Sequence, residues 1–200
     1  MTRPIEDGLD NAITGEVWQP LTPLDRMKRI SPWGYNVVHL DGLAWATNGH
    51  IIIRLGEAAG HRECHLLNVS VDGCRDAIRK LIIGPRPRYA LSYQRLYFTE
   101  LDCPVREMAC DEMTTYAKQY LIELAMAIAY SGYGTPAYWS DGPGKPIVVA
   151  CGTAVVAILM PIRDRLCRKD SWREIESERD WLVERSYYTH YMRQEDGDDE

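Results

Sequence analysis

The pattern of hydrophobic and polar positions predicts a short helix followed by strands in the first part of the chain. Thr22 and Pro23 are typical of a helix start, because a threonine side chain can accept hydrogen bonds from the first turn and proline fits the first helical position. This helix is expected to end near Ile30. The next stretch, YNVVHLDGLAWATNGHIIIRLG, has strand character and is broken at two dipeptides typical of hairpin turns, Asp41-Gly42 and Asn48-Gly49. We therefore predict a strand, one helix and then two or three strands in this first block.

Two further blocks repeat this order. In the second, HLLNVSV is strand-like, Asp72 can cap a helix over CRDAIRKLII, and RYALSYQRLYFTEL alternates around an expected turn near Tyr93-Gln94. In the third, Asp111 or Thr114 begins a long apolar helix through TTYAKQYLIELAMAIAY, and PIVVACGTAVVAILMPIR contains two strand-like runs that meet at Cys151-Gly152. Blocks of a helix and a hairpin at a spacing of roughly 45 to 50 residues predict an internal structural repeat.

The two ends of the chain lack this pattern. Residues 1–16 mix charges, glycine and proline without a period and are expected to form an irregular lead-in. Ser171 to Glu174 fits a capping box, so residues 164–192 are predicted to be a C-terminal helical extension that ends near Met192. Residues 193–200 are strongly acidic and are expected to be disordered. The folded α+β domain is thus assigned to residues 17–163.

Composition narrows the classes of protein to which the chain can belong. The content of 46% hydrophobic and 26% charged residues lies in the range of ordinary folded domains. The formal net charge of −6 argues against a generally basic nucleic-acid binder. However, the acidic residues after Gln194 account for most of this charge, so a local basic face that contacts DNA remains open.

Cysteine spacing and hydropathy favour the cytoplasm. The 6 cysteines are scattered without a CxxC pair, and no signal-peptide pattern opens the chain, which favours a reducing compartment. The longest apolar stretch, from Ile147 to Ile162, is interrupted by Gly152 and Pro161 and is shorter than the roughly 20 residues that a membrane span needs. We therefore expect a cytoplasmic protein with no membrane role.

Two short segments resemble the β subunit of bacterial DNA polymerase III, the replicative sliding clamp. LAWATNGH, from Leu43 to His50, is similar to a clamp segment whose core is A-T-D-G-H and which follows a strand and a turn. VVAILMPIR, from Val155 to Arg163, is similar to the closing strand of the clamp, which ends V-M-P-M-R. Residues 68–81 and 111–126 resemble clamp helices. The resemblance covers residues 17–163 in pattern and implies DNA-clamp-like repeats of strand-helix-hairpin units, here with an added C-terminal helix.

The resemblance also implies a binding site. In clamps these two segments lie together and line a surface pocket for the short hydrophobic clamp-binding motif of polymerases and repair proteins. A flexible Met, a rigid Pro and an aliphatic Ile make an adaptable apolar floor, and His and Arg side chains can hydrogen-bond a peptide. The alternative is that Met160 and Ile162 are strand core residues and that His50 only caps a turn. The candidate peptide-binding residues are Thr47, Gly49, His50, Met160, Pro161, Ile162 and Arg163.

The helices of clamps face DNA, and the first two predicted helices each carry a basic face. Such faces can contact the phosphates of double-stranded DNA without reading its sequence, and the alternative is an ordinary solvated helix surface. This chain is too short to encircle DNA alone, so a ring would require a homo-oligomer. The candidate DNA-binding residues are Arg26, Lys28, Arg29, Arg75, Arg79 and Lys80.

Other candidate sites are weaker. His61, Cys64 and His65 form an H-x-x-C-H cluster, but no second pair completes a four-ligand metal site. The acidic pairs Asp111-Glu112 and Glu174-Glu178 have no nearby nucleophile or convincing histidine partner. We therefore predict no catalytic residues, no metal and no cofactor.

A cluster of aromatic residues surrounds the Gly/Pro-rich loop before the last hairpin. Tyr130, Tyr133, Tyr138 and Trp139 form either an interaction surface or a cover for the end of the sheet, because aromatic rings bury large areas at low entropic cost.

The sequence as a whole predicts a non-enzymatic, reduced clamp-like protein of phage or mobile-element type. It is expected to bind replication or repair proteins that carry clamp-binding motifs. The alternative is a clamp fold repurposed as an inhibitor, in which the C-terminal helix and the acidic tail engage an unrelated host protein.

Overall fold

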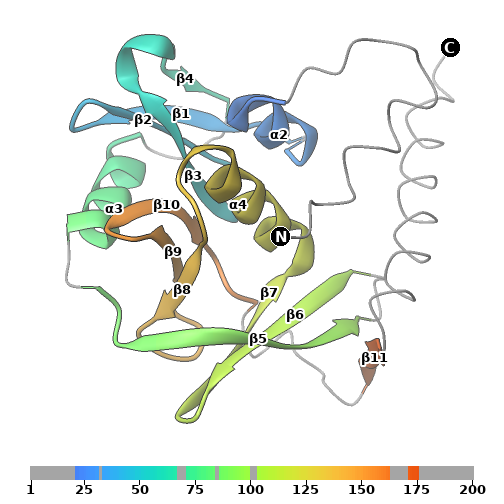
Figure 1. The fold of residues 1–200 in the computed structure, drawn as a ribbon. Coiled ribbons are helices and arrows are strands. Elements are labelled where there is room, and N and C mark those ends of the chain that lie inside the picture. The colour runs from blue at the N-terminus through green and yellow to red at the C-terminus, as the bar shows by residue number, and fades with distance from the viewer. Residues whose placement is uncertain are drawn as a thin grey trace, which may run out of the picture.

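The computed structural model describes residues 21–31, 33–66, 71–83, 86–99, 103–162 and 171–175 (Figure 1). These residues form an α+β fold in which a large antiparallel sheet is covered by helices. The helices are α2 (Pro23–Arg29), α3 (Val71–Ile83) and α4 (Gln119–Gly132), and a short 3₁₀ turn, η2, spans Ala58–Gly60. The predicted lead-in of residues 1–16 and the acidic tail of residues 193–200 lie outside the described residues.

An antiparallel meander of three strands follows each of these helices. After α2 come β1 (Asn36–Leu40), β2 (Leu43–Thr47) and β3 (Ile51–Glu57); after α3 come β5 (Tyr89–Phe98), β6 (Pro104–Cys110) and β7 (Met113–Lys118); and after α4 come β8 (Ala137–Ser140), β9 (Ile147–Cys151) and β10 (Ala154–Leu159). The short strands β4 (Cys64–His65) and β11 (Arg173–Ile175) pair with β1 and β5. The helices begin at residues 23, 71 and 119, so their order and spacing are as predicted.

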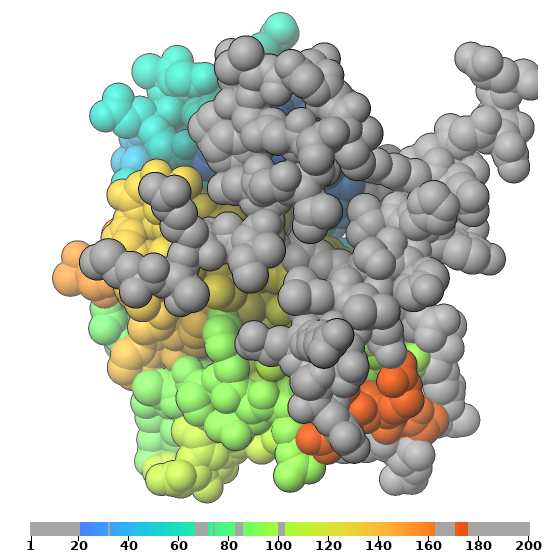
Figure 2. Space-filling view, turned by 45° about the vertical axis from the view of Figure 1, so that its right-hand side comes forward, coloured from blue at the N-terminus to red at the C-terminus, as the bar shows by residue number. Residues whose placement is uncertain are grey.

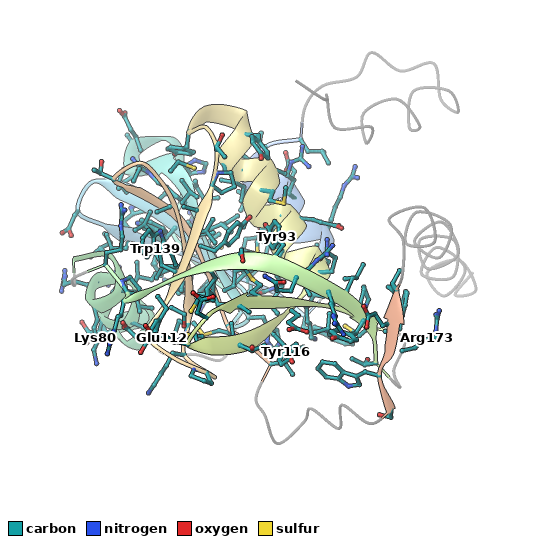
Figure 3. The ribbon with its side chains drawn as sticks, turned by 60° about the horizontal axis from the view of Figure 1, so that its bottom comes forward. Lys80, Tyr93, Glu112, Tyr116, Trp139 and Arg173 are labelled. Carbon is teal, nitrogen blue, oxygen red and sulfur yellow. The ribbon has the colours of Figure 1, made fainter. Side chains whose placement is uncertain are left out.

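The meanders join into one sheet with the order β4-β1-β2-β3-β10-β9-β8-β5-β6-β7. The first and third meanders meet through their last strands, β3 and β10, with Ile51 opposite Leu159. The third and second meet through their first strands, β8 and β5. Strand β5 pairs with β8 at one end and with β11 at the other, and Figure 3 shows Trp139 of β8 and Arg173 of β11 far apart near these two ends. In Figure 2 the green β5–β6 region occupies the bottom of the molecule, with β11 in orange-red beside it.

Helices pack on both faces of the sheet. Side chains alternate between the two faces of β1, β2, β3 and β10, as strand geometry requires. The face that carries Val37 and Leu159 packs against Met27 of α2 and against the apolar side of α4. The opposite face, which carries Val38, packs against Ile78 of α3. Because α3 lies on the other face from α2 and α4, the three helix-and-meander units are not packed equivalently.

The predicted hairpin turns are confirmed. Asp41 and Gly42 join β1 to β2, and their φ angles of 50° and 78° are both positive, which a two-residue type I′ turn requires. Asn48 to His50 joins β2 to β3, and Gly152 lies in the turn between β9 and β10. These turns depend on local backbone chemistry, which explains why the sequence reveals them.

Two predicted elements of the second and third blocks are wrong. Strand β5 has no turn at Tyr93-Gln94 but runs on to Phe98, with an irregularity in its pairing with β6 between Tyr93 and Leu96. Residues 113–118 form strand β7 instead of the first turns of a helix, and α4 begins only at Gln119. Pairing with β6 buries Thr115 and Ala117, so a tertiary contact overrides the local helical pattern here.

The predicted capping box at Ser171 is also wrong. Residues Arg173–Ile175 form strand β11, which pairs with β5 and buries Ile175 against Leu96 and Phe98. Trp172 packs on the rings of Tyr97 and Tyr116, at centroid distances of 5.8 and 5.3 Å. Within the predicted C-terminal helical extension of residues 164–192, residues 173–175 are therefore a strand, and residues 164–170 and 176–192 lie outside the described residues.

Candidate functional site

The two segments that carry the clamp resemblance lie side by side in the folded chain. Strands β3 and β10 are antiparallel neighbours, and beyond the last paired residues the Met160 amide donates a hydrogen bond to the His50 carbonyl oxygen at 2.8 Å. The turn that contains Gly49 and the strand end that contains Met160 therefore form one continuous piece of surface, although they are far apart in sequence.

The Thr47–His50 turn is held by its own side chains. The Gly49 amide donates to Thr47 Oγ1 at 3.1 Å, and Asn48 Oδ1 accepts the amides of His50 and Ile51 at 3.0 and 3.1 Å. Asn48 also donates to Ser31 Oγ at 3.0 Å, which ties the turn to the end of α2. Thr47 itself is buried, so it supports the turn from below, whereas Gly49 and His50 are exposed.

The second segment runs from β10 toward β7. Met160, Pro161 and Ile162 are all partly exposed. Met160 packs on the α3 side of the sheet, and the Ile162 amide donates to the Tyr116 carbonyl oxygen of β7 at 2.8 Å. Hydrogen bonds at both ends thus fix this segment between β3 and β7. Arg163, the last candidate residue, lies outside the described residues.

Lys118 is a member of this region that the sequence did not reveal. It is the last residue of β7 and lies on the same side of the strand as Tyr116, two residues away. Partial burial lowers the pKa of His50, and the nearby positive charge of Lys118 lowers it further. The ammonium nitrogen of Lys118 lies 5.8 Å from the ring centre of Tyr120. The predicted helix start at Asp111 or Thr114 would have placed Lys118 inside a helix, so no local signal could have indicated its position.

The candidate DNA-binding residues do not form one surface. Those on α2 and those on α3 lie on opposite sides of the sheet. Several of them also interact with other residues of the chain. On α2, Lys28 pairs with Asp25 at 3.6 Å, and Arg26 donates to the Leu21 carbonyl oxygen at 3.4 Å. On α3, Arg75 pairs with Glu63 at 2.6 Å and with Asp72 at 3.2 Å, and Arg79 pairs with Asp76 at 3.9 Å. Arg29 and Lys80 are exposed.

The other candidate clusters do not converge on a reaction centre. The described residues contain no group of three or more His, Cys, Asp or Glu side chains that could hold a metal ion. Asp111 and Glu112 form the exposed turn between β6 and β7 and cap no helix. Glu174 pairs with Arg95 at 3.1 Å across β11 and β5, and Glu178 lies outside the described residues.

The tyrosine cluster near the last hairpin is mainly structural. The hydroxyl groups of Tyr93 and Tyr138 are hydrogen-bonded, and their rings lie 4.9 Å apart. Burial raises the pKa of Tyr138 to about 12 and raises that of Tyr93 as well. Tyr138 belongs to the main core, Trp139 lies under the guanidinium of Arg86, and Tyr130 remains exposed.

Comparisons with protein-family models, curated proteins and solved structures found no match to this chain. Among the described residues, no helix has the length and apolar character needed to cross a membrane.

Proposed function

We propose that this chain is a non-enzymatic, sliding-clamp-like protein that binds a short peptide segment of a partner protein involved in DNA replication or repair. The binding surface consists of Gly49, His50, Met160, Pro161 and Ile162, and is called the β3–β10 surface below. The observation that carries the proposal is the hydrogen bond from the Met160 amide to His50, because it joins the two clamp-like segments into one surface.

The side chains of this surface are better suited to peptide binding than to catalysis. Met160 and Ile162 offer flexible and aliphatic side chains that are only partly covered, next to the rigid ring of Pro161. His50 provides a ring that can form a hydrogen bond at the edge of this apolar area. The backbone beneath is fixed by the bonds of Met160 to His50 and of Ile162 to Tyr116, so the surface is largely preorganised for binding.

One part of the fold supports the clamp-like part of the proposal. Helices α2 and α4 lie on one face of the sheet, each is followed by a meander, and the two meanders meet through β3 and β10. Helix α3 lies on the opposite face and has no counterpart in this arrangement. Peptide binding at the β3–β10 surface does not require the chain to encircle DNA.

Fluorescence polarisation with a labelled peptide that carries a clamp-binding motif tests the proposed function. We expect saturable binding that His50→Ala and Met160→Ala each weaken by roughly tenfold, because central contacts of an interface commonly contribute about 1.4 kcal/mol or more. The matched controls are His65→Ala, at an exposed histidine of β4, and Met126→Ala, at a partly buried methionine of α4. The proposal is wrong if the peptide does not bind, or if the controls weaken binding as much as the two site variants.

A further inference from the structure

The positive charge of Lys118 stands next to the β3–β10 surface. The carbonyl oxygen of Tyr116 (labelled in Figure 3), two residues earlier on β7, accepts a hydrogen bond from the Ile162 amide. This bond places the end of the β3–β10 surface alongside the part of β7 that ends in Lys118. On the other side, the Lys118 charge acts on His50. Through β7, Lys118 therefore lies close in the fold to the Ile162 end of the surface, and its charge acts on the His50 end.

Among the described residues, Lys118 forms no ion pair with a carboxylate. The ion pairs among those residues involve other cations, and the Lys118 charge acts on His50 and on the Cys103 thiol. Burial raises the pKa of Cys103, so the thiol is uncharged at neutral pH. The ammonium group has an aromatic neighbour, Tyr120, which attracts it only weakly compared with an anion.

We propose that Lys118 selects partner peptides in which a carboxylate stands beside the apolar residues that contact Met160 and Ile162. This inference rests on the proposed function of the β3–β10 surface. The formal net charge of −6 repels acidic peptides at long range, so the preference comes from a local contact between the carboxylate and the Lys118 ammonium. Such a contact at a partly exposed lysine is worth a factor of up to roughly five in affinity.

A pair of labelled peptides tests this inference. Both carry the same clamp-binding motif, and they differ only in a Glu or a Gln that flanks its apolar residues; a short series moves this position along the peptide. We expect the full-length chain to bind one Glu peptide of the series roughly fivefold more tightly than its Gln partner. Lys118→Met should abolish this preference without weakening the Gln peptide, and Lys118→Arg should retain it. The matched control is Lys145→Met, at an exposed lysine between β8 and β9.

The outcomes separate this inference from the proposed function. If Glu and Gln peptides bind equally throughout the series, or if Lys118→Met keeps the preference, Lys118 does not select a carboxylate. In that case, the proposed function would still hold if the Gln peptide binds and Met160→Ala weakens this binding. If neither peptide binds, both proposals fail. Loss of the preference in Lys118→Met together with its retention in Lys118→Arg and Lys145→Met would establish the contact.

Discussion

Lys118 and His50 are electrostatically coupled, although one ends β7 and the other precedes β3. The positive charge of Lys118 adds to the effect of partial burial, and together they hold the pKa of the His50 imidazole below its ordinary value of 6.5. His50 is therefore neutral at physiological pH and can offer one ring nitrogen as a donor and the other as an acceptor.

Removal of the Lys118 charge should raise the pKa of His50. We expect Lys118→Met to move this pKa upward toward 6.5, and Lys145→Met to leave it unchanged. The measurement is an NMR titration of the His50 ring. Because the pKa of His50 is lower in the folded chain than in the unfolded chain, protonation of His50 favours unfolding. This loss of stability is absent above pH 6.5 and grows as the pH falls toward the lowered pKa. An unchanged His50 pKa in Lys118→Met would refute the coupling.

The hydrogen-bonded Tyr93–Tyr138 pair should make the fold sensitive to alkaline pH. Tyrosines of the unfolded chain ionise near pH 10.0, whereas buried Tyr138 keeps its proton up to a pKa of about 12. Stability from this group is therefore full below pH 10 and is lost as the pH rises toward 12. We expect the wild type to lose more unfolding free energy over this range than Tyr138→Phe, as measured by denaturant titration at several pH values. Equal losses in both proteins would contradict this account.

Gly34 should not tolerate a side chain. Its φ of +105° is in the region that favours glycine, and an added Cβ would lie 3.0 Å from the Leu66 carbonyl oxygen and 3.2 Å from Leu66 Cβ. We expect Gly34→Ala to cost about 1 to 3 kcal/mol of unfolding free energy, because both the strain and the contact oppose the folded state. In Gly60→Ala, the control, the new Cβ meets nothing within 4 Å, and the change should stay within about 0.5 kcal/mol. Equal effects in chemical denaturation would show that the Leu66 contact does not constrain this site.

Glu63 should stabilise the edge of the sheet. Its carboxylate accepts the His39 amide at 2.7 Å and the Arg75 guanidinium at 2.6 Å, which joins β1 to α3. The hydrogen bond from Arg75 holds the pKa of Glu63 below its ordinary value of 4.5, so this stabilisation is present above pH 4.5 and is lost as the pH falls through the lowered pKa.

We expect Glu63→Ala to lower the unfolding free energy by about 1 kcal/mol at pH 7, from the lost bond to the His39 amide. The difference from wild type should shrink at acid pH, as followed by thermal unfolding between pH 7 and roughly pH 3. Glu57→Ala, at an exposed glutamate of β3, is the control and should have little effect at any pH. A loss in Glu63→Ala that does not depend on pH would rule out the carboxylate as its cause.

The elements that depend on local chemistry could be predicted from the sequence, and those that depend on distant partners could not. Thr22 caps α2 by accepting the Asp25 amide at 3.2 Å, as predicted, and Asp41-Gly42 forms the predicted turn. Residues 113–118 look helical in isolation but pair with β6 instead. The apolar stripe of α3 also carries no information about which face of the sheet it covers.

Some residues of the candidate site could likewise be predicted from the sequence, and others could not. The resemblance of two short segments led to His50 and Met160, and the structure places them next to each other. The burial of Thr47 could not be predicted, because it depends on how the turn packs against Ser31 and α2. Lys118 lies at the site because residues 113–118 pair with β6 as strand β7. The predicted helix over residues 114–130 left no such strand, so the sequence could not place Lys118 there.

The central position of β10 has a consequence for biosynthesis. Strands β3 and β10 meet in the middle of the sheet, yet more than half of the described chain separates them in sequence. While the ribosome has not yet released Ala154–Leu159, both β3 and β9 present an unpaired hydrogen-bonding edge rich in isoleucine and valine. Such edges pair readily with other chains, and contacts between distant residues form slowly. We therefore expect the nascent chain, before β10 emerges, to be the form of this protein that most needs a chaperone.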